Sequence, residues 1–115
     1  MFNRKIIGSG NIVERKYLLS DAIEKLDVDV PGTYNISAVP SHEITYTIDD
    51  NLLDFIEITM KNGVLGVKKT KRNEWKDISI IFNIGTDKLR DIRAANMSKV
   101  FCDGLYTAEM FKIDV

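Results

Sequence analysis

Residues 23–28 have the sequence IEKLDV, and the chain repeats their apolar spacing at residues 89–94 (LRDIRA) and 110–115 (MFKIDV). Each copy carries apolar side chains at its first, fourth and sixth positions, and the last two copies begin 21 residues apart. A repeat near that length is typical of one coil of a parallel β-solenoid, in which each coil buries its inward side chains against the next. The repeat therefore predicts that the chain ends in the coils of a β-helix.

The remainder of the chain alternates apolar and polar residues with the period of two that is typical of β-strands. Residues 77–84 (DISIIFNI) are the most apolar stretch and predict a central strand. Asn62-Gly63, the strongest short hairpin signal, separates two alternating runs and predicts a β-hairpin near residues 56–67. Residues 49–56 combine an acidic opening with apolar residues at helical spacing, which indicates one helical turn. We expect an all-β fold.

Composition excludes several classes of protein. The chain has 16 basic and 17 acidic residues, so no global charge attracts nucleic acid or anionic lipid. Its one cysteine, Cys102, provides neither an internal disulfide nor a cysteine cluster for a metal, and we expect no cofactor. No apolar run approaches the roughly 18 residues that span a bilayer, and the apolar pair Ile6-Ile7 is too short for a signal peptide. As written, the sequence predicts a soluble, cytoplasmic chain without an export signal.

Several short motifs follow one another in a specific order. They are GSGN at 8–11, the stretch from Ile23 to Gly32 that ends in Pro31-Gly32, DNLLDFI at 50–56, KNGVL at 61–65, and the repeats at 89–94 and 110–115. This series resembles the head GIN domain family of bacterial proteins, also known as putative auto-transporter adhesins. The resemblance covers nearly the whole chain, and its most specific part is the Asn-Leu-Leu run followed by the Asn-Gly hairpin.

The resemblance implies an N-terminal β layer that leads into a right-handed parallel β-helix. It also implies exported or envelope-associated proteins with a role in adhesion and without established catalytic residues. We therefore expect residues 1–115 to form a single head-GIN-like domain, the N-terminal part of a right-handed parallel β-helix that is truncated at its last coil. The expected function is that of a non-enzymatic structural or interaction module, with a glycan or a surface protein as its partner.

An open last coil has a physical consequence for association. Such an end exposes an apolar cross-section and unpaired backbone groups unless a cap or a partner covers it. The residues that would form this end are Met110, Phe111, Ile113 and Val115. We expect them to be a self-association edge that pairs with a second copy, giving a homo-oligomer, or with a following segment.

Asp27, Asp29 and Trp75 are the candidate ligand-contact residues. On a strand, the two aspartates lie on the same outward face about 7 Å apart, a spacing that suits calcium binding or work on sugars. A second hypothesis is therefore a carbohydrate-binding or carbohydrate-active β-helix. No third ligand accompanies the pair, so a solvated strand face is the favoured interpretation and no metal site is expected.

A third hypothesis concerns residues 68–75 (KKTKRNEW), where basic side chains lie near Trp75. Basic residues beside a stacking aromatic are typical of single-strand nucleic-acid binding. Glu74 and the slightly negative net charge oppose that interpretation, and a charged connection between strands explains the run, so no nucleic acid is expected. His42, the one histidine, lies sixty residues from Cys102, and no pattern brings the two together for catalysis.

Overall fold

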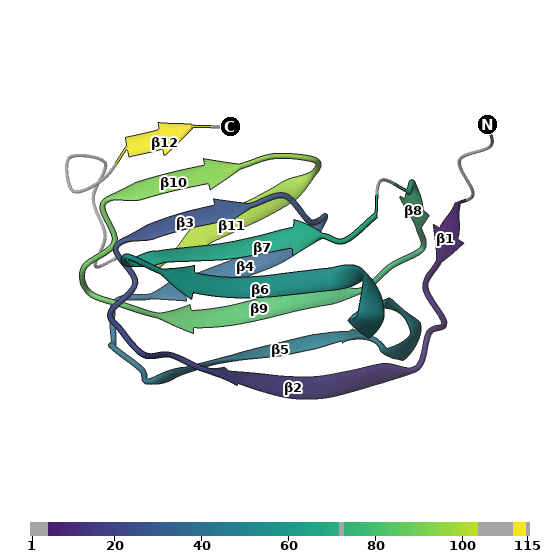
Figure 1. Cartoon of the computed structure of the whole chain (residues 1–115), viewed down its shortest axis with the longest axis horizontal. Coiled ribbons are helices and arrows are strands. Elements are labelled where there is room, and N and C mark those ends of the chain that lie inside the picture. The colour runs from purple at the N-terminus through teal and green to yellow at the C-terminus, as the bar shows by residue number, and fades with distance from the viewer. Residues whose placement is uncertain (1–4, 72, 104–111, 115) are drawn as a thin grey trace.

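The computed structural model describes residues 5–71, 73–103 and 112–114 of the chain. Within them a short 3-10 helix, η1 (Asp50–Phe55), separates strands β5 and β6 (Figure 1). In chain order, the strands are β1 (Ile6–Ile7), β2 (Ile12–Leu18), β3 (Lys25–Val28), β4 (Gly32–Ser37), β5 (Glu43–Asp49), β6 (Ile56–Lys61), β7 (Val64–Lys69), β8 (Trp75–Lys76), β9 (Ile80–Gly85), β10 (Asp91–Ala94), β11 (Ser98–Cys102) and β12 (Lys112–Asp114). No helix in these ranges is long and apolar enough to cross a membrane.

Two five-stranded sheets pack face to face. Their strand orders are β12-β10-β3-β7-β6 and β11-β4-β9-β5-β2, and the chain passes from the first sheet to the second after β3 and again after β10. The short strands β1 and β8 form a separate parallel pair at one end of the two sheets (Figure 1). The most apolar stretch of the sequence supplies β9, the middle strand of its sheet, as the sequence predicted.

The expected right-handed parallel β-helix is wrong. In a parallel β-helix each strand pairs in parallel with the equivalent strand of the next coil. Here β6 runs antiparallel to β7, and β5 runs antiparallel to both β2 and β9, so both sheets are mixed. The cause of the first reversal is the tight turn at Asn62-Gly63, which turns the chain back within one sheet. Neither sheet closes on itself within the described residues.

The apolar repeat nevertheless marks strands that lie side by side. β3 and β10 pair in parallel with Leu26 opposite Ile92 and Val28 opposite Ala94. β10 pairs in parallel with β12, with Ile92 opposite Ile113. The three copies therefore lie on adjacent strands of one mixed sheet with Leu26, Ile92 and Ile113, their fourth positions, in register, although they are not coils of a β-helix.

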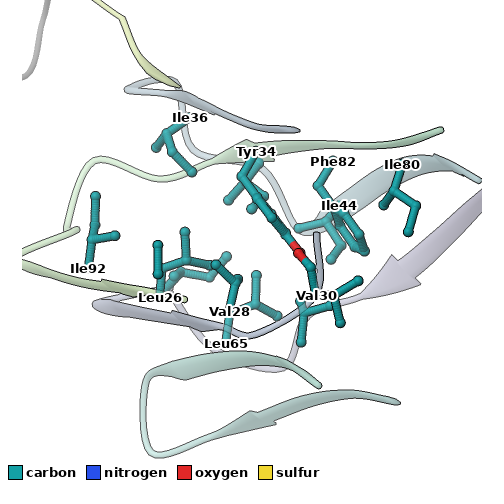
Figure 2. Close-up of a cluster of buried hydrophobic side chains, with 14 of the residues drawn as sticks. Leu26, Val28, Val30, Tyr34, Ile36, Ile44, Leu65, Ile80, Phe82 and Ile92 are labelled. Carbon is teal, nitrogen blue, oxygen red and sulfur yellow. The ribbon is translucent and has the colours of Figure 1, made fainter. Parts of the chain in front are cut away.

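The core lies between the sheets. Leu26, Val28 and Leu65 from one sheet are fully buried with Tyr34 and Phe82 from the other (Figure 2). Apolar residues alternate along these strands, so one face of each sheet enters the core and the other contacts solvent. Continuous packing between the two sheets follows from that alternation.

Aromatic rings cross the middle of the second sheet. The Phe82 ring stacks on Tyr34 with a centroid distance of 5.1 Å and on Tyr46 at 4.7 Å. These residues lie directly opposite one another on β4, β9 and β5. The Tyr34 hydroxyl donates to the Val30 carbonyl at 2.7 Å, which satisfies the buried phenol. Burial raises the pKa of Tyr34 above its ordinary value, so this hydroxyl remains a donor.

The predicted hairpin and helical turn are both present. β6 and β7 pair around Asn62 and Gly63, whose φ angles of 52° and 78° are the positive values that a type I′ turn requires. The six residues of η1 follow β5 directly, and Leu52 from this helix is fully buried. Local turn chemistry and apolar spacing therefore predicted these two elements correctly.

Candidate functional site

A pocket of about 950 Å³ lies at the end of the molecule where β3, β7 and β10 finish. Its lining includes Asp29 after β3, Lys69 at the end of β7, Trp75 on β8, and Asn96 and Met97 after β10. These residues are far apart in the sequence. Parallel strands bring them together because the carboxyl ends of such strands meet at one edge of a sheet.

The turn after β10 forms one wall of this pocket. The Ser98 backbone N–H donates to the Ala95 carbonyl at 3.3 Å, and the two residues between them have positive φ angles, 54° at Asn96 and 65° at Met97. Asparagine tolerates this left-handed conformation well, whereas methionine adopts it rarely. The Met97 side chain is 83% exposed, so a strained turn presents a flexible apolar side chain to solvent.

The two aspartates that the sequence singled out have different surroundings. Asp29 lines the pocket and accepts a hydrogen bond from the Asn96 side-chain amide. Asp27 is outside the lining and forms an ion pair with Lys68 at 2.8 Å, across the β3–β7 pairing. The structure does not join the two carboxylates in one site. Among the described residues, no group of three or more His, Cys, Asp or Glu side chains is placed to hold a metal ion.

Lys69 and Trp75 lie near the two ends of the basic segment, residues 68–75, and contact each other. The Lys69 ammonium lies 4.8 Å from the centroid of the Trp75 ring, a cation–π geometry, and donates to the Asn73 carbonyl at 3.0 Å. Trp75 Nε1 is buried and has no hydrogen-bond partner among the described residues. An unpartnered buried N–H is costly, so the indole is held here by packing and by Lys69.

A second pocket, of about 400 Å³, shares Pro31, Trp75 and Met97 with the first. Its remaining lining combines three isoleucines, Ile78, Ile80 and Ile81, with Gly32, Thr33, Ser79 and Lys99. The first pocket has more charged side chains in its lining and the second has more aliphatic ones, and we call them the polar and the apolar pocket. Reasoning from the sequence identified Asp29 and Trp75 but missed Asn96 and Met97, whose left-handed turn carries no glycine to signal it.

Two of the motifs behind the family resemblance contact each other. Ser9 Oγ donates to Asp50 Oδ1 at 2.6 Å, and the Asn11 side chain donates to Asp50 Oδ2 at 2.8 Å. The Ser9 backbone N–H donates to Asn51 Oδ1 at 3.0 Å. The hydrogen bonds from Ser9 and then Asn11 lower the pKa of Asp50 below its ordinary value. We call this set of contacts between residues 8–11 and 49–51 the N-terminal clasp.

Asp49 is the buried member of the N-terminal clasp, with 1% of its surface exposed. Its Oδ2 accepts from the Gly10 N–H at 3.0 Å, and its Oδ1 accepts from the Ser79 N–H at 2.6 Å. A side chain at Gly8 would place its Cβ 2.6 Å from Asp49 Oδ2, so the close approach requires glycine. The motif at 8–11 is therefore structural and holds β1 and β2 against the rest of the fold.

The remaining sequence candidates do not join the pocket. Met110, Phe111 and Val115 lie outside the described residues, and Ile113 is on β12, opposite Ile92. Burial, and then the charge of Asp103, raise the pKa of Cys102. A raised pKa leaves less of the thiolate, the reactive form, so the chemistry of this residue does not suggest a nucleophile.

Residues 22–115 match the model of the family described as "Putative auto-transporter adhesin, head GIN domain". The chain belongs to the head GIN domain family. This confirms the resemblance that the sequence motifs indicated. The description of the head GIN domain family names adhesins and no enzymatic activity. A search of the curated proteins found no match.

Solved structures share the fold of this head GIN domain. An adhesin-like protein of Parabacteroides merdae matches with a TM-score of 0.70 at 20% identity, over 86% of this chain and 41% of that one. One from Bacteroides fragilis matches with a TM-score of 0.67 at 18% identity, over 86% and 46%. A Parabacteroides distasonis protein titled "Putative lipid binding protein" matches with a TM-score of 0.68 at 20% identity, over 87% and 44%. The chain thus spans less than half the length of these proteins.

Proposed function

We propose that this head GIN domain is a non-enzymatic interaction module of a bacterial cell-surface protein, and that it binds a glycan in the pocket beside Trp75. The observation that carries the proposal is the convergence of Asp29, Asn96 and Lys69 around one half-buried indole. Ligand pockets typically combine aromatic surface with a few polar groups that fix orientation. A sugar ring has apolar C–H faces and a rim of hydroxyls, so it is complementary to such a mixture.

Each polar group has a distinct part in this binding. The second Asp29 oxygen accepts from a sugar hydroxyl, while Asn96 holds the first. Lys69 moves from its place over Trp75, and the ring face that it leaves packs against the sugar. The exposed Met97 adapts to the outer face of the ligand. The family description, which names adhesins, supports the cell-surface setting.

The test compares an aspartate in the pocket lining with one outside it. Glycan arrays followed by titration calorimetry are run on the natural chain, Trp75→Ala, Asp29→Asn and the control Asp54→Asn, which changes an exposed carboxylate outside the lining. We expect Trp75→Ala and Asp29→Asn to weaken binding at least about tenfold, since a hydrogen bond to a charged group contributes about 1.5–3 kcal/mol. Asp54→Asn leaves binding within about twofold. No glycan binding by the natural chain, or binding that survives both pocket variants, would refute the proposal.

A second candidate ligand is a lipid or another amphiphile. The apolar pocket that shares Trp75 and Met97 with the polar one favours it, and one similar structure has a title that names lipid binding. Ile81, 38% exposed, lines only the apolar pocket of the two. If the ligand is an amphiphile, phospholipid vesicles bind the natural chain and Ile81→Lys abolishes that binding. Glycan binding that Ile81→Lys leaves unchanged assigns the ligand to the polar pocket instead.

A further inference from the structure

The strand β2 (Ile12–Leu18) is the outermost strand of its sheet, and no described strand pairs with its outer side (Figure 1). Backbone bonds flank its pairing with β5: Asp50 N–H donates to Asn11 O at 2.9 Å, and Leu19 N–H donates to His42 O at 2.8 Å. Because antiparallel pairs alternate in direction, odd-numbered residues of β2 bond to β5. The even-numbered residues therefore direct their N–H and C=O groups outward.

The sequence of β2 is complementary to itself when a second copy runs antiparallel to it. With a two-fold axis at Arg15, Glu14 lies opposite Lys16 of the second copy, and Lys16 opposite its Glu14. The same register sets Ile12 opposite Leu18, two apolar side chains that are 44% and 76% exposed in the single chain. We propose that β2 is an interaction surface for a second copy of this chain, joined by antiparallel β2–β2 pairing centred on Arg15.

Backbone direction and charge select the same register. The four residues that face their counterparts in hydrogen-bonded pairs are the even-numbered ones, whose backbone groups point outward. Moving the axis to Glu14 or to Lys16 keeps that pattern but loses both Glu14–Lys16 contacts. An axis at any of these three residues sets one charged side chain opposite its own copy, so the two opposite-charge contacts decide the register. The axis at Arg15 alone joins opposite charges on both sides and matches apolar residues at both ends.

Arg15 limits this association. Its Nη1 donates to the Glu14 carbonyl at 2.9 Å, one of the groups that point outward. In the paired sheet this carbonyl accepts from the Lys16 N–H of the second copy, so Arg15 has to release it first. The Arg15 guanidinium groups of the two copies also lie opposite each other at the two-fold axis, and their like charges repel. These effects make the pairing reversible and protect the free edge from wider aggregation.

The test is a charge-exchange cycle read by sedimentation velocity over a wide concentration range. Lys16→Glu creates two Glu–Glu contacts and is expected to weaken dimer formation about tenfold or more, whereas the double variant Glu14→Lys/Lys16→Glu restores it. Lys16 also lies 3.7 Å from Glu43 within the chain. Both variants lose that internal contact. If the double variant nevertheless regains dimer formation, the effect of Lys16→Glu comes from the contact between copies. Circular dichroism confirms that each variant is folded.

Two further variants complete the design. Arg15→Ser frees the Glu14 carbonyl and removes the contact at the axis, so we expect it to strengthen the dimer about tenfold. Ile113→Lys, on the opposite sheet, is expected to leave the dimer unchanged. Three results would overturn the proposal: a monomer at every concentration for both the natural chain and Arg15→Ser, a double variant that fails to restore association, or loss of association on Ile113→Lys alone.

Discussion

At the scale of single residues, the buried carboxylate of Asp49 has the clearest structural role. It accepts backbone hydrogen bonds from Gly10 and Ser79, which belong to segments about 70 residues apart. Each N–H group donates to a different oxygen of this one carboxylate. A single side chain therefore replaces part of a sheet ladder at this end of the molecule.

We predict that Asp49→Asn lowers the free energy of unfolding by about 3 kcal/mol, since an amide offers one acceptor where the carboxylate offers two and sets a donor against an N–H. Urea unfolding followed by circular dichroism measures the change. The matched control is Asp54→Asn, which alters an exposed carboxylate nearby and is expected to change the free energy by less than about 0.5 kcal/mol. Equal effects of the two variants would contradict the structural role of Asp49.

At the scale of elements, the aromatic stack on β4, β9 and β5 links three neighbouring strands. Phe82 is in the middle, with a tyrosine ring on each side. Cross-strand aromatic pairs contribute beyond the area that they bury. The middle strand of this sheet is therefore stabilised both by its two ladders and by its central side chain.

We predict that Phe82→Ala lowers the free energy of unfolding by about 4 kcal/mol, because it creates a cavity in the core and removes both stacking contacts. Phe101→Ala, which truncates a ring that is 57% exposed on β11, is the control and is expected to have little effect. Thermal unfolding of the two variants gives the comparison. A similar loss in both would mean that burial of the stack contributes little.

Sequence patterns predicted elements better than their assembly. The Asn62-Gly63 turn has a local chemistry that only a few turn types satisfy, and the run at 77–84 is too apolar for an edge strand, so both were predictable. The repeat marks three strands that pair in parallel, β3, β10 and β12, but the coils predicted from it are absent. The antiparallel placement of β5 depends on pairings with β2 and β9 that no local pattern encodes, and the β-helix prediction failed there.

In the candidate site, too, single residues were predictable from the sequence and their arrangement in space was not. Asp29 and Trp75 were candidates by residue type, but their convergence depends on which strand ends meet, and this is set by the topology. No turn was predicted at Asn96 and Met97, and neither residue was a candidate for the site, because a left-handed turn without glycine has little composition signal. The predicted edge at residues 110–115 stays a prediction.

At the scale of the whole molecule, the N-terminal clasp joins the first strands to η1 and makes stability depend on pH. The folded-state pKa of Asp50 is lowered, so its contribution is present above the unfolded pKa and is lost as the pH falls through the folded value. We predict that the urea midpoint of the natural chain falls more steeply in acid than that of Asp50→Asn. Because Asp50 is exposed, added salt should reduce the difference between them.

The acid experiment has a second arm. Ser9→Ala removes the first hydrogen bond that lowers the pKa of Asp50 while leaving the carboxylate in place. Its midpoint should therefore fall less steeply than that of the natural chain and more steeply than that of Asp50→Asn. Parallel curves for all three proteins would show that the clasp does not set the acid response.

The position of Trp75 also gives the molecule an optical property. It is the only tryptophan, so excitation at the red edge of indole absorption reports on one place in the chain. An ammonium group lies over its ring, and its N–H is shielded from solvent. A molecule that enters the pocket and displaces Lys69 changes the electric field at the indole, and therefore shifts its fluorescence. The fluorescence of the unlabelled protein therefore measures binding of the proposed glycan in this pocket.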